Sequence, residues 1–377
     1  MEKQETTFYQ ELQKCKDLDG RDNRGKQHDL SFILLGLVIG LLRKRDGKLS
    51  SIHRSMQNMG VALCSFLGID NQRIVSRSQL PEVLGKVNLL VFEKLLFNHY
   101  GIVLSTEEKN WFAGDGKELK GSIEKGDKRG EAIVQLVRHK DKITLGQTFY
   151  NGTKESEKPT LRTLLKQSGG CHQKITADAL HLCPLTTELI AQSGGIFLIG
   201  LKGNQALLLS DMIEYLPKLR LVNQEVTHDK GHGRIEKRTY SQYDISGEYF
   251  APRWKKTGFK SLFIVVRKRF DTQTQEESEE TSYYISNGVA IKEDRSYFKA
   301  IREHWSVEVN NHIRDVTLQE DQFKTKNKAI TKIMSGLRTL VINILLKLKP
   351  KNLIAKIEFF QDCPNELFKW LRTINFL

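Results

Sequence analysis

Two aspartates carry the first chemical signal in this sequence, because each follows a short apolar run and has small residues on both sides. Asp115 comes after the run at 111–113, and Asp178 comes after the run at 175–177. Ligand sites in α/β proteins gather where strands end, and carboxylate oxygens are the ligands that hard divalent cations prefer. The pair therefore predicts a shared divalent-metal site. The alternative is that each aspartate only caps the turn that follows its strand.

Glu308 is the third acidic candidate, in the segment HWSVE, which has the pattern of a helix. His312 follows at i,i+4 spacing, so the two side chains would lie on one helix face. A surface glutamate near a histidine is the simpler interpretation of this pair. Asp315, Glu320 and Asp321 are competing acids further along the chain.

The chain is basic: its 377 residues include 59 Lys and Arg against 45 Asp and Glu, which leaves a net charge of +14. Such an excess favours a polyanionic partner, with nucleic acid ahead of an anionic membrane. Three basic runs flank the candidate acids, which is typical of a surface that follows a phosphate backbone. The runs are Lys117, Lys120, Lys125, Lys128 and Arg129; Arg253, Lys255, Lys256, Lys260, Arg267, Lys268 and Arg269; and Lys324, Lys326, Lys328, Lys332 and Arg338.

The composition is that of a folded globular protein, with 39% hydrophobic residues, 28% charged residues and 7 prolines. It excludes the disordered and collagen-like classes, and the length allows two or three domains. The polar N-terminal segment predicts no secretory signal. The apolar run at 30–42 is shorter than the roughly 20 residues that cross a bilayer, so it predicts a buried helix. We therefore expect a soluble intracellular protein.

The periodicity of apolar residues divides the chain into a helical part, an α/β part and a β-rich part. Predicted helices in the first hundred residues span 30–42, 52–67 and 84–96. Predicted strands then span 131–137, 143–149, 175–177 and 196–201, with helices at 159–167 and 184–192 between them. Later strands are predicted at 234–240, 261–266 and 282–286. The acidic segment 271–280 is predicted to be a mobile loop, and the apolar stripe at 330–345 a core helix.

A series of motifs resembles one family, the bacterial insertion-sequence DDE transposases, in the branch that contains the H repeat-associated proteins. The motifs occur in the family's order and extend from about residue 10 to the C-terminus. Each motif alone is weak, but together they are specific. They are GKQHDLSFILLGLVIGLL, AGDGKELKGS, ITADALH, FLIGLKGNQ, KGHGRIEKR, YYISN, REHWSVE and RDVTLQED.

The resemblance implies an α/β fold with an RNase H-like core, which is a mixed sheet flanked by helices. The catalytic domain would comprise 106–377, after a helical N-terminal region at 1–105. A β-rich insertion, at about 206–287, would precede the last catalytic acid. This division agrees with the order of strands and helices predicted from periodicity.

The resemblance also assigns the chemistry. Its catalytic and metal-binding acids fall on Asp115 in AGDGK, Asp178 in TADA and Glu308 in HWSVE. The expected cofactor is Mg²⁺, with Mn²⁺ as a substitute and no small-molecule cofactor. In a two-metal site, water would first nick the DNA at the transposon end, and the freed 3′-hydroxyl would then attack target DNA.

The expected partner is DNA, both the terminal repeats of the insertion sequence and the target. Lys117, Lys202, Arg234, Lys237 and Arg238 are the predicted DNA contacts, with Lys202 and Arg234 near the scissile phosphate. Two ends must be brought together, so the resemblance implies a homodimer on DNA. It also implies a bacterial cytoplasmic location at the nucleoid, and no membrane partner is expected.

One departure from the family follows Glu308. Val309 stands where similar proteins have Asn, and the segment 312–315 is one residue shorter than in those proteins. A deletion in a helix rotates all later residues by about 100°, so the helix would be misphased beyond His312. Two alternative functions therefore stay open: a degenerate, non-catalytic copy that only binds DNA, and an RNase H-like nuclease without strand transfer.

Overall fold

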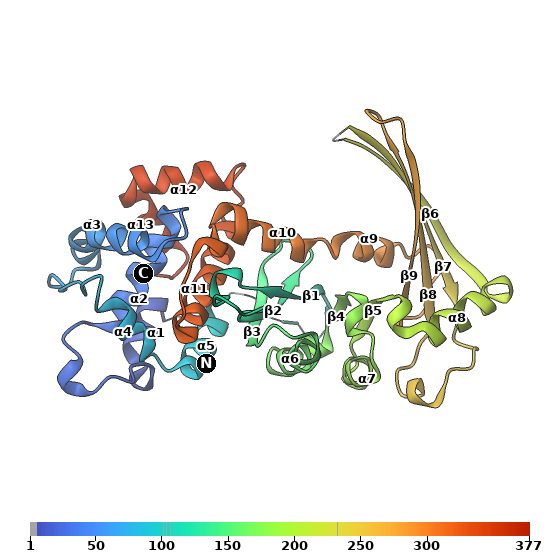
Figure 1. The fold of residues 1–377 in the computed structure, drawn as a ribbon, viewed down its shortest axis with the longest axis horizontal. Coiled ribbons are helices and arrows are strands. Elements are labelled where there is room, and N and C mark those ends of the chain that lie inside the picture. The colour runs from blue at the N-terminus through green and yellow to red at the C-terminus, as the bar shows by residue number, and fades with distance from the viewer. Residues whose placement is uncertain (1–5, 101, 103, 106, 232) are drawn as a thin grey trace.

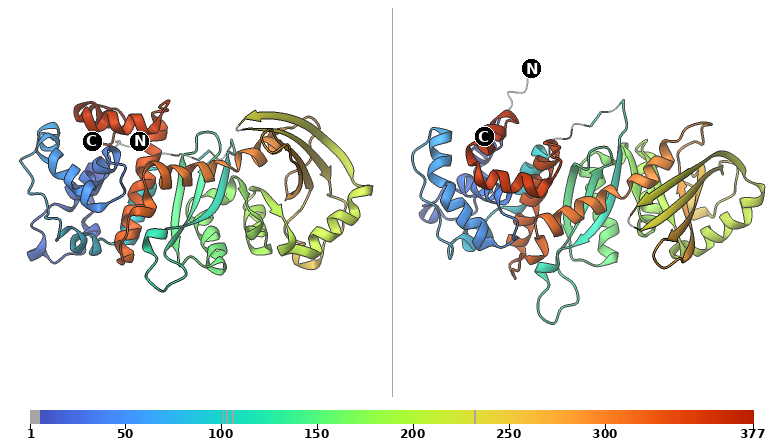
Figure 2. Two further views of the ribbon diagram at one scale, coloured as in Figure 1. Left: turned by 45° about the horizontal axis from the view of Figure 1, so that its top comes forward. Right: turned by 90° about the horizontal axis from the view of Figure 1, so that it is seen from above.

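The computed structural model describes residues 6–100, 102, 104–105, 107–231 and 233–377 (Figure 1). The chain is elongated, with three parts in a row. A helical part lies at one end, a sheet flanked by helices lies in the middle, and a long curved sheet lies at the other end (Figure 2). The fold is thus mixed α/β, as predicted.

The N-terminal helices confirm two predicted helices and divide the third. α2 and α3 contain the predicted ranges 30–42 and 52–67, whereas the predicted helix at 84–96 is interrupted after Gly85. The second piece begins after Asn88, because the side chain of Asn88 caps it by accepting the N–H of Val91. The helices are α1 (Phe8–Lys14), α2 (Leu30–Arg43), α3 (Leu49–Leu67), α4 (Leu80–Gly85) and α5 (Leu89–His99).

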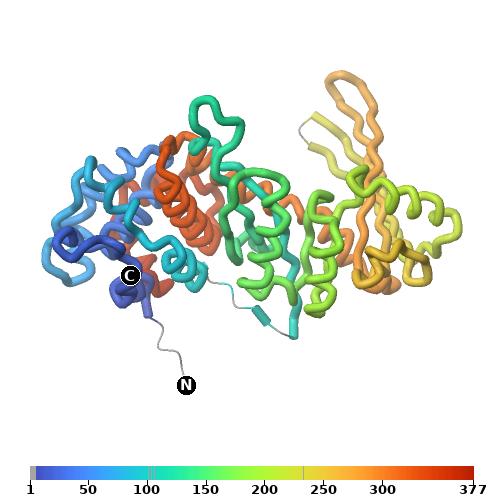
Figure 3. Tube along the Cα trace, turned by 60° about the horizontal axis from the view of Figure 1, so that its bottom comes forward, coloured from blue at the N-terminus to red at the C-terminus, as the bar shows by residue number. Residues whose placement is uncertain are grey.

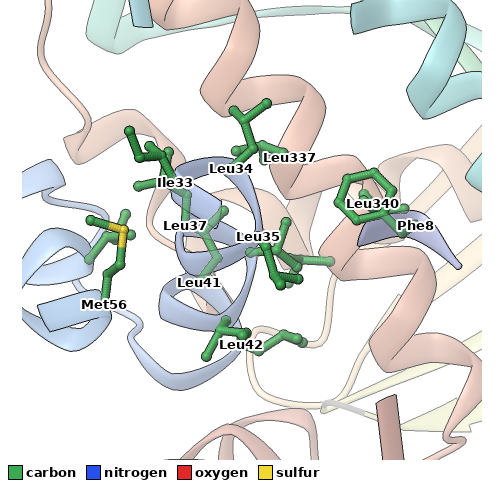
Figure 4. Close-up of a cluster of buried hydrophobic side chains, with 14 of the residues drawn as sticks. Phe8, Ile33, Leu34, Leu35, Leu37, Leu41, Leu42, Met56, Leu337 and Leu340 are labelled. Carbon is green, nitrogen blue, oxygen red and sulfur yellow. The ribbon is translucent and has the colours of Figure 1, made fainter. Parts of the chain in front are cut away.

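Helix α2 is the centre of the largest apolar core, and all of its residues are buried. Figure 4 shows Leu34 and Leu35 of α2 among side chains from α1, α3 and the C-terminal helix that contains Leu337. The same core includes side chains of three C-terminal helices. They are α11 (Lys328–Lys347), α12 (Leu353–Asp362) and α13 (Pro364–Thr373). The C-terminal helices therefore pack with the N-terminal part; the resemblance places them within the catalytic domain at 106–377.

Helix α11 confirms the predicted core helix. It is long and apolar enough to cross a membrane, but 83% of its apolar window is buried inside the protein. Two polar residues in it have buried partners: the Asn343 side chain bonds both the backbone N–H and the C=O of Thr144, and Arg338 bonds the carbonyl of Gly47. These contacts are those of a core helix of a folded protein.

The middle and far parts share one nine-stranded sheet, with strand order β3-β2-β1-β4-β5-β9-β8-β7-β6. β1, β4 and β5 are parallel neighbours, and the remaining pairs are antiparallel. The strands are β1 (Trp111–Glu118), β2 (Ala132–Arg138), β3 (Thr144–Tyr150), β4 (Lys174–Ala177), β5 (Ile196–Leu201), β6 (Arg220–Gly231), β7 (Arg234–Asp244), β8 (Ser261–Asp271) and β9 (Glu277–Ser286).

Helices cover both faces of this sheet (Figure 3). α6 (Lys154–Gln167) and α7 (Pro184–Gln192) pack on the face that Phe112 points to. α10 (Ser306–His312) packs on the opposite face, where Val307 contacts Ala113. Because neighbouring residues of a strand point to opposite faces, Asp115 points to the same face as Ala113, which is the α10 side.

Most α/β elements lie where the sequence predicts them, and the ranges of α7 and β5 agree with it. α6 begins five residues earlier than predicted, since Thr153 caps it by accepting the N–H of Ser156. Pro159 therefore lies inside the helix and not in its first turn.

The segment at about 206–287 adds a helix and four strands to the same sheet. It begins with α8 (Ala206–Tyr215), a helix that the sequence did not predict. Its last strand, β9, pairs with β5, so the segment extends the central sheet. β9 is followed by α9 (Ser296–Glu303), which packs on the curved sheet through Tyr297 and Phe298.

The predicted mobile loop at 271–280 is too long: residues 272–276 connect the strands, while Asp271 and Glu277–Glu280 belong to strands. β8 ends at Asp271 and β9 begins at Glu277. The acidic residues of β9 face basic residues of β8, and the Nζ atom of Lys268 lies 2.9 Å from the carboxylate of Glu279. Opposite charges across a strand pair stabilise the pairing. The composition of the acidic segment alone does not show that basic residues lie opposite it.

Candidate active site

Asp115 lies within β1 and not at its end, which corrects the predicted position. It stands opposite Gln135 of β2, and the strand continues to Glu118. The flanking glycines leave room for side chains of α6, which lie directly on this part of the strand. A Cβ atom at Gly116 would lie 2.5 Å from Cδ of Glu157, a distance that real Cβ contacts do not show.

Asp178 follows β4 directly, as predicted. β4 is the parallel neighbour of β1, and Gly114 of β1 lies opposite Ala177 of β4. Asp115 directly follows the first of these residues, and Asp178 directly follows the second. One oxygen of Asp178, Oδ1, accepts the N–H of Leu180 at 3.0 Å. The capping alternative therefore holds for Asp178, while its exposed carboxylate keeps further oxygen lone pairs available.

The negative charge of Asp178 acts on the carboxyl group of Asp115. Burial, and after it the negative charge of Asp178, raise the pKa of Asp115 to about 7. Both causes disfavour the ionised form of the acid. Two carboxylates held this close together are typical of catalytic and metal sites.

Glu308 lies on α10, which covers the face that Asp115 points to. Its side chain is exposed, and partial burial raises the pKa of its carboxyl. In the described part of the chain, no three His, Cys, Asp or Glu side chains converge closely enough to hold a metal ion. The structure therefore brings Asp115 and Asp178 together and leaves Glu308 at a distance from them.

Two histidines that the sequence did not single out connect α9 and α10 to the sheet. His304 Nδ1 lies 3.0 Å from the hydroxyl of Thr176 on β4, and His139 Nε2 lies 2.9 Å from the same hydroxyl. Burial lowers the pKa of His304 to about 4 and that of His139 to about 3, so both rings are neutral at pH 7. This contact fixes the HWSVE segment one helical turn before Glu308. His304, which lies within the HWSVE segment, is the sequence feature that could have indicated this contact.

The acids that compete with Glu308 have partners of their own. Asp315 Oδ1 lies 2.7 Å from Nζ of Lys117, and Asp321 lies 3.7 Å from the same ammonium. Glu320 pairs with Arg314 at 2.9 Å. Lys117 itself is only 8% exposed. A buried, paired lysine does not present its charge to a phosphate backbone, in contrast to the predicted DNA contact.

Lys202 lies at the same edge of the sheet as Asp178. It follows β5, the parallel neighbour of β4, and it is exposed. The turn after it is fixed against the Asp178 turn: Asn204 Nδ2 donates to the carbonyl of Ala179 at 2.6 Å, and Gln205 Nε2 donates to that of Leu182 at 2.8 Å. Of the predicted DNA contacts, Lys202 is the one that this geometry places beside the aspartates.

The other three predicted contacts lie on β7, at the end of the curved sheet that stands away from β1 and β4 (Figure 1). Lys237 is exposed and lies opposite Lys268, and Arg234 is the partly exposed first residue of the strand. Arg238 is buried and pairs with Glu236 and with Asp229, the latter at 2.5 Å. The structure does not bring these residues to the aspartates. His232, in the same motif, lies outside the described residues.

The segment that is short relative to the family is well packed. After α10 the helix changes to a π-helical turn at Ile313–Thr317. The fully buried Arg314 bonds Glu320 at 2.9 Å and Gln147 at 3.0 Å, and it also bonds Thr339. The change of helix type therefore begins directly after His312, and Glu308 lies before it.

This chain is similar in sequence to several known proteins over most of its length. It is 28% identical to the H repeat-associated putative transposase YhhI of Escherichia coli K12 over 340 residues, which is 87% of each chain. It is also 28% identical to the putative protein YbfL of the same strain, over 85% of each chain. The putative transposase YncI of Escherichia coli O157:H7 is 26% identical, over 71% of this chain and 69% of its own. No protein-family model matches. Over most of its length, this chain is thus similar in sequence to H repeat-associated proteins named as putative transposases.

Proposed function

We propose that this protein is a DNA transposase that cleaves insertion-sequence ends and joins them to target DNA. Relatives named as transposases over most of the chain support the general function. The observation that carries the mechanism is the pair Asp115 and Asp178, on neighbouring parallel strands, with the pKa of Asp115 raised first by burial and then by the charge of Asp178. The strand order β3-β2-β1-β4-β5, with antiparallel β2, supports an RNase H-like core for this pair.

The residues present fit a divalent cation. Asp115 and Asp178 offer carboxylate oxygens, which Mg²⁺ and Mn²⁺ prefer, and their mutual repulsion is the kind that a bound cation relieves. Asp115 and Asp178 would hold the metal, and Glu308, the third acid that the resemblance implies, would have to come closer to join them. When bound, Mg²⁺ would activate the attacking oxygen and neutralise charge on the leaving oxygen.

The chain's own residues would position the DNA. Lys202, exposed beside Asp178, would contact a phosphate next to the scissile bond. His304 would hold the helix that carries Glu308 against β4 through Thr176. Substitution of Lys202 by Ala is expected to weaken cleavage, whereas unchanged end binding and cleavage would exclude this role. The homodimer on DNA and the cytoplasmic, nucleoid-associated location remain part of the proposal.

The test uses a supercoiled plasmid that carries the repeats flanking the gene, incubated with purified protein and Mg²⁺ or Mn²⁺. Nicks at the repeat ends are expected with the wild type and not with Asp115→Asn. Asp70→Asn is the matched control, because Asp70 is exposed and lies in the helical part. Binding without nicks would favour the degenerate DNA-binding copy. Nicks whose 3′ ends never join a target would favour the nuclease.

A further inference from the structure

Three arginines of the curved sheet share one buried glutamate. The Glu236 carboxylate lies 2.6 Å from Nη2 of Arg267 and 3.4 Å from Nε of Arg269. It also pairs with Arg238. Each guanidinium has about five N–H donors, so a single carboxylate cannot satisfy three of them. Because the side chains of Arg267 and Arg269 are partly exposed, their remaining donors can accept a further partner from the surface.

Positive charge is in excess around this glutamate. Arg302 of α9 joins the group through Asp229 of β6, which lies 3.3 Å from Arg302 and 2.5 Å from Arg238. Four arginines thus surround two closely paired acids. Glu280 is a third acid, but it lies 3.9 Å from Arg267 and is 68% exposed, so its pairing in water is weak. The four residues, here called the arginine cluster, are Arg238, Arg267, Arg269 and Arg302.

The arginine cluster lies on the face of the sheet to which Asp115 points. Every second residue of a strand points to the same face, so Trp111 of β1 shares the face of Asp115. The Trp111 ring lies edge-on to Tyr297 of α9, with ring centroids 5.6 Å apart. Tyr297 in turn stacks on Phe263 of β8. Arg267 is four residues after Phe263 on the same strand, and it therefore points to this face as well.

The cluster also stands beyond the edge of the sheet where Asp178 lies. β5 ends at Leu201, opposite Tyr283 of β9, but β9 and β8 continue to pair beyond this level. Arg267 lies opposite Glu280 in that extended part. β8 is three strands away from β4, which at about 4.8 Å per strand is about 14 Å across the sheet. DNA advances about 3.4 Å per nucleotide, so DNA held at the aspartates would reach the cluster within a few nucleotides.

An exposed tryptophan continues this surface toward the candidate active site. Trp305 is 62% exposed, and it follows Arg302 and precedes Glu308 by three residues each. Such spacing places the three side chains along one side of a helical segment. His304, the residue before it, bonds Thr176 of β4, which fixes the tryptophan beside the strand that leads to the second aspartate. Arginines together with exposed aromatic rings are typical of surfaces that bind nucleic acid strands.

We propose that the arginine cluster and Trp305 form a surface that holds the DNA leading into the candidate active site. The inference rests on the proposed function, because this DNA is the one that the aspartates would cleave. Arg267, Arg269 and Arg302 would bind phosphates, and the Trp305 ring would pack against the DNA between them and the aspartates. Glu236 is a positioning residue that holds the guanidiniums together. It lies in the KGHGRIEKR motif, which thereby gains a role.

The test measures the affinity of the purified full-length protein for a fluorescent duplex with the flanking repeat, by anisotropy, at several salt concentrations. EDTA is present, so cation binding does not contribute. The double variant Arg269→Gln/Arg302→Gln removes two phosphate contacts. Its affinity at 0.1 M salt is expected to fall by about tenfold or more, and the slope of log affinity against log salt should decrease by about 2.

Lys230→Gln/Lys268→Gln is the matched control. Both lysines are exposed and lie on the opposite face of the same curved sheet, next to Ile235 and Lys237 of β7. This double variant removes the same charge, and its affinity and salt slope should stay close to those of the wild type. Equal losses for the two double variants would mean that only overall charge matters, and would overturn the proposed surface.

Trp305→Ala tests the neutral part of the surface. Its affinity should fall by about fivefold or more, with an unchanged salt slope, because an uncharged ring releases no counterions. Its melting temperature without DNA should stay close to that of the wild type, since the ring is mostly exposed. If the arginine double variant does not fold, Arg302→Gln alone replaces it, with an expected decrease in slope of about 1.

Failure of this inference differs from failure of the proposed function. If the wild type binds the repeat and nicks its ends, but the arginine and Trp305 variants bind as tightly as the wild type, the proposed function stands and the surface is overturned. If the wild type does not bind the repeat duplex, the proposed function fails, and the surface fails with it.

Discussion

At the scale of residues, Asp115 is the group whose charge the fold opposes most clearly. Burial and Asp178 hold its pKa at about 7, well above that of an exposed aspartate. The folded protein therefore binds this proton more tightly than the unfolded chain does. Stability must fall as pH rises from about 4 to 7, and the cost is fully present above pH 7.

Replacement of Asp115 by Asn should remove this cost. In metal-free buffer at pH 8, Asp115→Asn is expected to be more stable than the wild type by about 2 kcal/mol. The difference should shrink as the pH falls and vanish near pH 4, where the aspartate is protonated in both states. Thermal unfolding in the presence of EDTA at several pH values measures it. A variant that is less stable than the wild type at pH 8 would contradict the assignment.

Lys117 should contribute to stability and not to DNA binding. Its ammonium is buried beside Asp315, so Lys117→Ala leaves a partly buried carboxylate without its partner. A loss of about 1–3 kcal/mol is expected. Lys120→Ala is the control, since Lys120 is 67% exposed although it pairs with Asp321, and its effect should stay below about 1 kcal/mol. Equal melting temperatures for the two variants would exclude the buried ion pair.

The sequence indicates Asp115 and Asp178 because each follows an apolar strand pattern that is local in the chain. The pairing of Glu157 with His181, and of His304 with Thr176, cannot be predicted in this way. These contacts depend on which face of a helix meets the sheet, and the chain segments involved are far apart. The same reason explains why Lys117 was taken for a surface residue.

At the scale of elements, close packing of α2 and α3 depends on glycine. A Cβ atom at Gly40 would lie 2.9 Å from the backbone oxygen of Ile52 on α3. Gly40→Val should therefore force the helices apart and cost about 1–3 kcal/mol. Gly25→Val is the control, because a Cβ atom at Gly25 meets nothing within 4 Å. Thermal unfolding compares the two, and a Gly40 variant as stable as its control would contradict the packing.

Elements were predicted well where an apolar period continues without interruption, as in α7 and β5. β1 was predicted to stop before Gly114, because glycine and aspartate are poor strand formers. The strand continues because β2 pairs with it along Gly114–Glu118. Likewise, the acidic segment of β9 forms a strand because basic residues of β8 lie opposite it. In both cases the deciding residues lie on the partner strand.

At the scale of the whole molecule, both ends of the chain build the helical part. Phe8 of α1 stacks on Phe376 with ring centroids 4.6 Å apart, and Arg43 of α2 bonds the carbonyl of Phe360 on α12 at 3.0 Å. The sequence does not reveal this arrangement, because the apolar face of a helix does not show which other helix it packs against.

A fragment of residues 1–105, the predicted N-terminal region, should therefore not fold by itself. Without α11, α12 and α13, the buried faces of α2 and α5 would be exposed to water. We expect low cooperativity in its thermal unfolding, followed by circular dichroism, beside a cooperative transition of the full chain. A sharp, cooperative transition of the fragment would contradict the shared core.

The central claim is that Asp115 holds the divalent cation used in DNA cleavage. It is tested most directly by changing the ligand atom: Asp115→Cys offers sulfur, which Mn²⁺ accepts more readily than Mg²⁺ does. On a plasmid with the flanking repeats, we expect Asp115→Cys to nick the ends with Mn²⁺ and not with Mg²⁺, while Asp115→Asn nicks with neither. Cleavage by either variant with Mg²⁺ as the cation would contradict the claim.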